Sequence, residues 1–261
     1  MKNDLFGNRM KEYEGIEAER KFIPTLPIIV RLDGRCFSRL TKDLDRPYDS
    51  DMSELMTNVT IKLVEETGAI IGYTQSDEIS LILYSDSIDH PVYFNGRISK
   101  IISVISSVAT YWFNHLREDM DFPDSFFDLP GFFDCRAWNV PSRVEAVNSL
   151  LWREMDATKN SISMAARTHY THKQLHGVKR EGLLDMLMEK GINWNEYPAY
   201  FKRGTYIQKR AKPVDRTIPG HMNDDVTERS VVSTLLLPPL TRVVNRTGVF
   251  FEKQEPIVDE S

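Results

Sequence analysis

Cysteine is scarce in this sequence, and the two that occur, Cys36 and Cys135, lie far apart among 261 residues. They form no Cys-x-x-Cys pair, so neither a zinc site nor a disulfide framework is indicated. Unpaired cysteines are typical of a reducing compartment, and we therefore expect a cytoplasmic protein.

Long apolar runs are absent as well. The longest of them are far too short to cross a bilayer, and residues 1–21 lack the apolar segment of a secretory signal. An excess of basic residues is also missing. The net charge is −5, which argues against a surface coated with Lys and Arg for non-specific nucleic-acid binding. A local basic groove remains compatible with that charge.

Apolar residues are nevertheless abundant. They make up 41% of the chain, and aromatic residues make up 10%, so the sequence can build a real core. At this length we expect one large domain or a domain with a substantial extension. The composition indicates a folded globular protein without indicating what it does.

Residues 5–140 show alternating strand and helix patterns, which are distinguished by the spacing of their apolar residues. In order, the patterns predict a strand at 27–32, a helix from Asp51 to Gly68, strands at 69–74 and 78–84, a long helix from Arg97 and a strand at 132–140. This βαββαβ order is that of the split-βαβ, ferredoxin-like fold. We therefore expect an α+β protein whose first domain covers residues 5–140.

Residues 141–261 form the second predicted domain, a mainly helical extension with late strands. Ser142 and Glu145 form a capping box at the start of one helix, and a second helix is expected from Arg180 to Lys190. The remaining expectations are a strand at 201–210, a long mobile loop near 211–230 and a strand within 241–251.

Two acidic residues, Asp77 and Glu78, stand side by side between the strands at 69–74 and 78–84. A plain hairpin would favour Asn-Gly or Asp-Gly at such a turn. In a ferredoxin-like sheet the first and third strands are antiparallel neighbours, so the end of the first strand, at Asp33, lies beside the start of the third. We therefore expect Asp33, Asp77 and Glu78 to meet at one edge of the sheet as a catalytic site.

Carboxylates that are packed together raise one another's pKa values unless a cation neutralises them. Magnesium is the expected cation, because it prefers hard oxygen ligands and often uses one or two carboxylates together with substrate phosphates. Two such ions could activate an attacking hydroxyl and stabilise a leaving phosphate oxygen. The plainer alternative is that Asp33 only shapes an Asp-Gly turn and that the other two acids are solvated. Their convergence in the predicted topology favours the metal site.

Phosphate groups would also need cationic partners. The long second helix begins Asn-Gly-Arg-Ile-Ser-Lys, which places Arg97 and Lys100 on one face at a helix N-terminus, where the backbone amides and the dipole favour anions. Ser76 and the turn amides of residues 33–38 could bind phosphate as well. Without the acids, ordinary surface charge would be the preferred interpretation of Arg97 and Lys100.

Several of these stretches occur together in one known family. In chain order over residues 27–205, the matching pieces are VRLDGRCF, RPYD, YTQSDEISL, GRISK, FDCR, LLWREMDATKNSI and FKRGT. In this combination the sequence resembles the tRNA(His) guanylyltransferase family, including its 3′-to-5′ polymerase branch. The resemblance implies a catalytic polymerase-palm domain with two magnesium ions held by Asp33, the Gly34 carbonyl and Asp77. It also implies that Glu78 supports the metal site.

The resemblance further implies which residues bind nucleotide. The expected contacts are Asp33, Gly34, Arg35, Cys36, Phe37, Ser38, Arg46, Ser76, Asp77, Arg97 and Lys100. Among them, Arg46, Arg97 and Lys100 are the expected cations on the triphosphate side. ATP and GTP would be substrates, tRNA would be the macromolecular partner, and a homotetramer would be the assembly.

In the family reaction a tRNA 5′-monophosphate is activated by a nucleoside triphosphate, and the 3′-hydroxyl of an incoming nucleotide then attacks that end. Eukaryotic members carry a His-Ile-Asn-Asn segment after their Trp-Arg-x-x-Asp motif, whereas Thr158 stands in the place of that histidine here. This departure favours the bacterial and archaeal-like branch, which repairs truncated tRNA 5′ ends by template-dependent addition. The alternative within the family is untemplated guanosine addition to tRNA(His).

Two rival functions come from outside the family. A palm-type nucleotide cyclase would use the same metals without RNA, but the sequence lacks the Gly-Gly-Asp-Glu-Phe signature of the diguanylate cyclases. A catalytically silent RNA-binding module would gain nothing from acids beside phosphates.

Histidine and tryptophan supply weaker candidates. His169, His172 and His176 have no cysteine or acid nearby at zinc-binding spacing. Trp152 and Trp194 could stack on bases, but their positions in the apolar pattern favour a place in the core.

Overall fold

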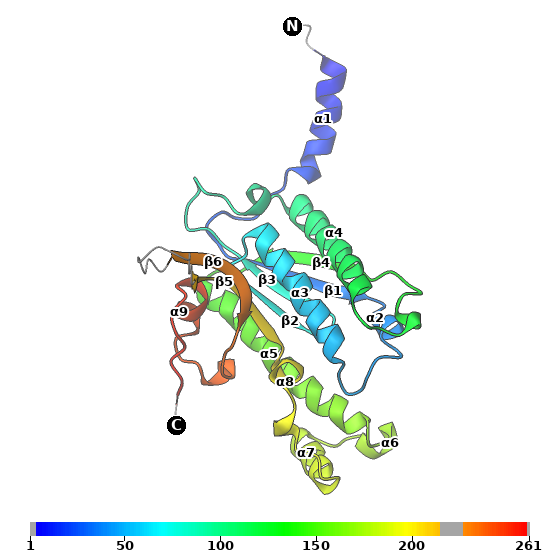
Figure 1. Ribbon diagram of the computed structural model, residues 1–261. Coiled ribbons are helices and arrows are strands. Elements are labelled where there is room, and N and C mark those ends of the chain that lie inside the picture. The colour runs from blue at the N-terminus through cyan, green and yellow to red at the C-terminus, as the bar shows by residue number, and fades with distance from the viewer. Residues whose placement is uncertain (1–3, 215–226, 260–261) are drawn as a thin grey trace, which may run out of the picture.

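One antiparallel sheet forms the centre of the computed structural model, which describes residues 4–214 and 227–259 (Figure 1). Within these residues the sheet has six strands in the order β4-β1-β3-β2-β5-β6. The strands are β1 Ile28–Arg35, β2 Ile71–Gln75, β3 Glu78–Leu83, β4 Phe132–Asn139, β5 Thr205–Val214 and β6 Thr227–Leu235. The first four lie in the 4-1-3-2 order of the ferredoxin-like fold, so the predicted α+β class is confirmed.

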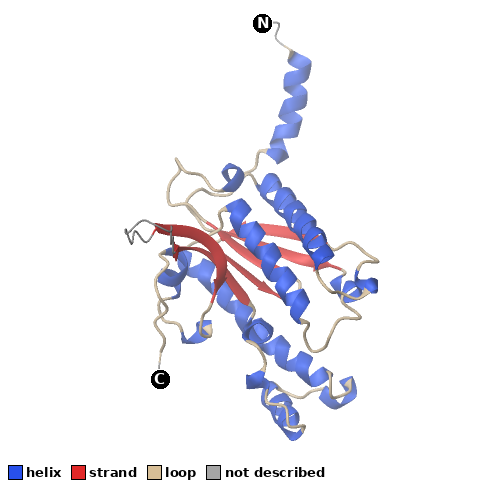
Figure 2. Ribbon diagram, viewed as in Figure 1, coloured by secondary structure: helices blue, strands red, loops and turns tan. Residues whose placement is uncertain are grey.

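Helices cover both faces of the sheet, as Figure 2 shows. The α-helices of the described residues are α1 Leu5–Ala18, α2 Phe37–Leu40, α3 Ser50–Thr67, α4 Ile98–Leu116, α5 Arg143–Arg167, α6 His172–Leu175, α7 Arg180–Glu189, α8 Ala199–Arg203 and α9 Arg246–Phe251. α3 and α4 pack on one face, α5 crosses the other, and α1 projects from the body (Figure 1). Within the described residues, no helix is long and apolar enough to span a membrane.

Strand β1 is buried on both faces. Val30 and Leu32 belong to the hydrophobic cluster beneath α3 and α4, whereas Ile29 belongs to the cluster beneath α5. Burial on both faces explains the continuous apolar run in the sequence. Arg31 interrupts that run on the α5 face, and this charged residue is only 7% exposed.

Helix α3 ends where the sequence predicts but begins earlier. Gly68 has φ +64° and donates its N–H to the Val64 carbonyl at 3.1 Å, which closes the helix with a left-handed residue. The N-cap is Asp49, not Asp51, because the Asp49 carboxylate accepts from the Met52 N–H at 2.8 Å.

The second predicted cap is confirmed. The Ser142 hydroxyl accepts from the Glu145 N–H at 3.1 Å and begins α5.

The C-terminal half is less helical than expected, because β5 and β6 extend the sheet beyond β2. The strand expected at 201–210 begins only at Thr205, after helix α8. The prediction of a loop near 211–230 is wrong at both ends, because residues 211–214 belong to β5 and residues 227–230 to β6. Residues 215–226 lie outside the described part. A paired edge can expose polar side chains, so its strands need no continuous apolar pattern.

A helix also replaces the strand expected within 241–251. Residues 246–251 form α9, and Val249 and Phe250 are fully buried in the cluster beneath α5. Periodicity alone cannot assign so short an apolar run to a strand or a helix. The domain boundary between residues 140 and 141 stays a prediction.

Candidate active site

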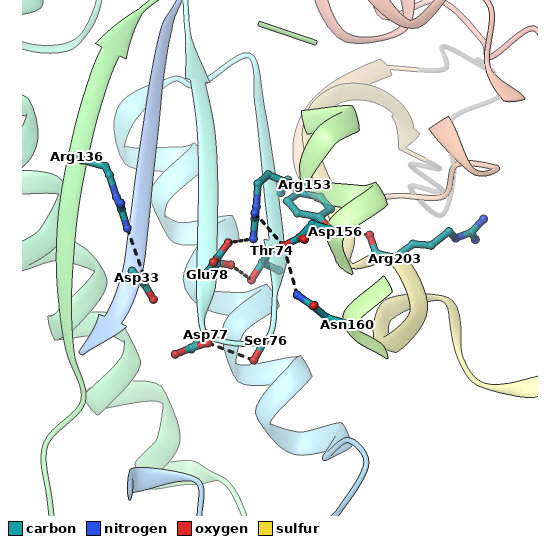
Figure 3. A network of polar contacts seen from close by, with 11 residues as sticks. Asp33, Thr74, Ser76, Asp77, Glu78, Arg136, Arg153, Asp156, Asn160 and Arg203 are labelled. Carbon is teal, nitrogen blue, oxygen red and sulfur yellow. Dashed lines mark hydrogen bonds and ion pairs between the residues drawn. The ribbon is translucent and has the colours of Figure 1, made fainter. Parts of the chain in front are cut away.

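The three predicted acids lie together where β1 ends and β3 begins (Figure 3). Asp33 pairs across the sheet with Glu78, and the Gly34 N–H donates to the Asp77 carbonyl at 3.1 Å. The antiparallel topology thus brings Asp33, Asp77 and Glu78 to one edge, as the sequence predicts. A fourth acid, Asp134, pairs with Asp33 from β4 on the other side, and the sequence analysis missed it.

The turn between β2 and β3 holds Ser76 and Asp77, where a plain hairpin would favour Asn-Gly or Asp-Gly. Gln75 pairs directly with Glu78, which leaves Ser76 and Asp77 as a two-residue loop. Ser76 has φ +54°, a conformation in which such turns normally use glycine. Its hydroxyl donates to the Asp77 carboxylate at 3.2 Å (Figure 3). The turn therefore places two polar side chains at a backbone cost of about 1–2 kcal/mol, as functional sites often do.

Asp77 carries a carboxylate that is unfavourable in the absence of a cation. Burial raises its pKa above the ordinary value, and the charges of Asp33 and Glu78 raise it further. A backbone hydrogen bond and the Ser76 hydroxyl oppose this shift without cancelling it. A bound cation would remove the cost of keeping the carboxylate charged.

Two arginines pair with the acids at this edge of the sheet (Figure 3). Arg136 on β4 lies 3.3 Å from the Asp33 carboxylate, and Arg153 on α5 lies 2.5 Å from that of Glu78. Arg153 also binds Asp156, one turn further along α5, at 3.1 Å. The sequence analysis gave neither arginine a role. Strand alternation could have found Arg136, whereas the position of Arg153 depends on where α5 crosses the sheet.

A cavity of about 300 Å³ opens beside the hairpin. Its polar lining includes Ser38, Arg46, Ser76 and Asp77, four of the residues predicted to bind nucleotide. The Arg46 guanidinium donates to the Thr41 carbonyl at 2.8 Å, which fixes the loop before α3. Small-molecule sites combine a mostly apolar wall with a few polar groups in roughly 300–1,000 Å³, so the cavity suits a nucleotide.

The loop after Asp33 is held by an aromatic cluster. The Phe37 ring is 2% exposed and packs against Phe113 and Phe133, and it also forms part of the cavity wall. Gly34 is required here, because a Cβ would lie 1.9 Å from the Phe37 ring. Arg35 and Cys36 are exposed at the end of β1, beside the same edge.

Arg97 and Lys100 lie at the other end of the sheet. The Gly96 carbonyl next to them accepts from the Phe22 N–H, and the pocket around Gly96 includes Ile28, the first residue of β1. β1 runs from that end to the acids, and α4 begins there (Figure 1). Within one chain the structure therefore does not bring these two cations to the predicted acids.

The donor atoms at this edge fit a hard divalent cation. Among the described residues, no group of three or more His, Cys, Asp or Glu side chains is arranged to hold a metal alone. The predicted set has only two carboxylates, those of Asp33 and Asp77, with the Gly34 carbonyl. Magnesium commonly binds through one or two carboxylates and completes its shell with water and substrate phosphates, so this set fits it.

The expectation that Trp152 belongs to the core is wrong, because the residue is 58% exposed. It lies directly before Arg153 on α5, next to the apolar stripe and not within it. Trp194 does pack against the cluster formed by α5 and α7, and its indole N–H donates to the Ser161 hydroxyl at 3.2 Å.

The fold and the site together indicate a palm-type nucleotidyltransferase, because Asp33 and Glu78 face each other on two central strands and Asp77, in the turn before Glu78, lines a cavity of about 300 Å³. The family model described as tRNAHis guanylyltransferase (Thg1) matches residues 7–141. The chain belongs to this family, which confirms the predicted family and enzyme class.

The chain is also similar to individual proteins of known sequence or structure. The chain is 31% identical over 234 residues to the uncharacterized protein R259 of Acanthamoeba polyphaga mimivirus. The match covers 82% of this chain and 80% of that protein. A solved bacterial tRNA(His) guanylyltransferase (Thg1)-like protein in complex with ATP is 40% identical, with a TM-score of 0.72 over 78% of this chain and 88% of that chain. A second such structure, in complex with GTP, is 31% identical, with a TM-score of 0.73 over 91% of this chain and 94% of that one.

Proposed function

We propose that the protein extends the 5′ end of tRNA in the 3′-to-5′ direction, opposite a template base, after ATP or GTP has activated the 5′-monophosphate. The observation that carries this proposal is the convergence of Asp33, Asp77 and Glu78 beside a cavity of about 300 Å³. The solved relatives in complex with ATP and with GTP support nucleoside triphosphates as substrates.

The proposed metal ligands are Asp33, the Gly34 carbonyl and Asp77, with Glu78 in support. Two magnesium ions there would supply charge neutralisation and activate the attacking hydroxyl. Among the chain's own residues, Arg153 on α5 holds the Glu78 carboxylate in place. Positioning of the reacting groups and neutralisation of their charge then do most of the catalytic work, as in other phosphoryl transfers.

Residues in the cavity would position the triphosphate. Ser38, Arg46 and Ser76 line it together, and the serine hydroxyls and the guanidinium can donate hydrogen bonds to phosphate oxygens. Asp77 lies between this cavity and Glu78, so a phosphate bound by these donors would lie next to the acids.

A template-dependent reaction is favoured over untemplated guanosine addition because of Thr158. Its hydroxyl donates to the Glu154 carbonyl, one turn earlier in α5, at 2.9 Å. The side chain thus serves the helix, and no histidine stands there to take part in reading a base. Base pairing would then select the incoming nucleotide.

Arg97 and Lys100 remain proposed triphosphate cations, although they lie far from the acids of their own chain. A second copy of the chain would have to bring them to the site. The homotetramer that the family resemblance implies is proposed for this reason.

Labelled nucleotide incorporation tests the proposed function. We expect label from GTP or ATP to appear in RNA only when magnesium and a 5′-truncated tRNA are both present, because the acids need the ion and the nucleotide needs an acceptor. Gel electrophoresis of RNA and chromatography of the nucleotides would be run on the same reactions. A cyclic product from GTP without RNA would instead establish a cyclase, and RNA binding without transfer would establish a silent binding module.

A further inference from the structure

A cluster of arginines lies beside the acids on the face of the sheet that α5 covers. Arg31 on β1 pairs with Arg136 on β4, and residues two apart on a strand share a face, so Arg31 lies on the same face as Asp33. Arg153 reaches this face from α5, next to Trp152. We call Arg31, Arg136, Trp152 and Arg153 the arginine shelf.

Arg31 is a buried cation that lacks a full set of partners. The residue is 7% exposed, and among the described residues its Nε atom is buried without a hydrogen-bond partner. The nearby carboxylates are already paired, that of Asp33 with Arg136 and that of Glu78 with Arg153. Such a buried cation is unfavourable unless an anion binds it.

Trp152 provides an aromatic surface at the same place. The residue is 58% exposed, and the guanidinium groups of Arg31 and Arg153 lie over the ring at 5.3 and 4.9 Å from its centroid. The two arginines hold the ring in position, because both are largely buried. An exposed, fixed aromatic ring beside cations is the combination on which nucleobases stack.

We propose that the arginine shelf binds the 5′-phosphorylated end of an RNA, with the phosphate on Arg31 and Arg136 and the terminal base on Trp152. This inference rests on the proposed function and adds the place of the RNA end to it. A free nucleotide carries the same two groups, a phosphate and a base. The open shelf suits the end of an RNA better, because single small molecules are usually bound in enclosed sites.

The position of the cavity of about 300 Å³, which we call the nucleotide cavity, supports separate binding places for the two substrates. It is lined by α2, the start of α3 and the turn before β3, together with Met164 of α5 and two residues of α8. Asp77 lines this cavity, whereas Asp33 and Glu78 are paired with Arg136 and Arg153 of the shelf. The RNA end and the nucleoside triphosphate would therefore reach the acids from two different sides.

Binding of two RNA hairpins that differ only in a 5′-monophosphate or a 5′-hydroxyl tests the proposal. No nucleoside triphosphate is added, so that no transfer can occur. We expect the wild type to bind the phosphorylated hairpin about tenfold or more tightly, as hydrogen bonds to a charged phosphate allow. Arg136→Ala and Arg31→Gln should lose this preference. Trp152→Ala should weaken the binding of both hairpins, and Trp152→Phe should restore most of it.

Arg229→Ala is the matched control, since Arg229 is an exposed arginine on β6, the opposite edge strand. It should keep the wild-type preference. Thermal melting of each variant verifies its fold, and Arg136→Ala carries the test if Arg31→Gln does not fold. Binding of GTP, measured separately, should be unchanged in Trp152→Ala.

Two results would overturn the proposal. One is a phosphate preference that survives in Arg136→Ala, and the other is a Trp152→Ala variant that binds GTP weakly but RNA normally, which would make the shelf a nucleotide site. A wild type that adds nucleotides without preferring phosphorylated hairpins contradicts the shelf alone. A wild type that prefers them but adds no nucleotide contradicts the proposed function alone.

Discussion

Replacing Asp77 with asparagine should reduce nucleotide addition at least about a hundredfold. The Asp77 carboxylate is a proposed metal ligand in the turn before β3, next to Ser76 and the proposed nucleotide cavity. An amide is a neutral ligand and cannot balance the charge of divalent ions. Single-turnover addition to a 5′-truncated tRNA, at saturating nucleotide and magnesium, measures this loss.

The same variant should be at least as stable as the wild type in the absence of metal at neutral pH. Burial raises the pKa of Asp77 in the folded protein, so the folded state binds a proton more tightly than the unfolded state. Stability therefore falls as the pH rises from the ordinary carboxyl range through the raised pKa, and asparagine avoids this loss. Thermal melting in EDTA between pH 4 and pH 8 tests this expectation.

Asp86→Asn is the matched control for Asp77→Asn, because Asp86 is an exposed acid beyond the other end of β3. It should leave both the rate of addition and the melting temperature unchanged. Near-normal addition by Asp77→Asn would contradict the assignment of the metal ligands. A clearly lower melting temperature of that variant in EDTA would show that the carboxylate has a structural role.

Replacing Arg153 with methionine should lower the free energy of unfolding by about 2–4 kcal/mol. The Arg153 side chain is 9% exposed and binds both Glu78 and Asp156. Methionine keeps much of the apolar stem but leaves two partly buried carboxylates without their cation. In a chain of this length the melting temperature should fall by roughly 5–10 °C. Chemical denaturation and thermal melting both measure this effect.

Lys159→Met on the exposed side of α5 is the control for Arg153→Met and should change stability little. Addition by Arg153→Met should also fall at temperatures where the variant is still folded, because Glu78 loses the group that holds it. A variant with wild-type stability and rate would mean that the Glu78–Arg153 ion pair contributes neither to folding nor to the site.

The palm-like half of the fold could be predicted because its local patterns and its topology agree. Helix α3 has apolar residues at helical spacing and a glycine stop, and β1 has the continuous apolar run of a strand buried on both faces. The C-terminal strands β5 and β6 could not be found in this way. Their side chains include exposed polar residues such as Lys209, and their place in the sheet is set by pairing with β2.

The acids of the site could be predicted for the same reason. Asp33 and Glu78 face each other whenever the first and third strands are antiparallel neighbours with this register. The roles proposed for Arg31, Arg153 and Trp152 depend instead on where α5 crosses the sheet. No local pattern specifies that crossing, which is also why Trp152 was expected in the core.

The most direct test of templated addition is the identity of the nucleotide added to one truncated tRNA as the template base opposite the gap is varied. If base pairing selects the nucleotide, the added residue should change to the Watson–Crick partner of each template base. The same rule should hold on tRNAs other than tRNA(His). Addition of guanosine whatever the template base, and only to tRNA(His), would contradict the proposal and would establish untemplated addition.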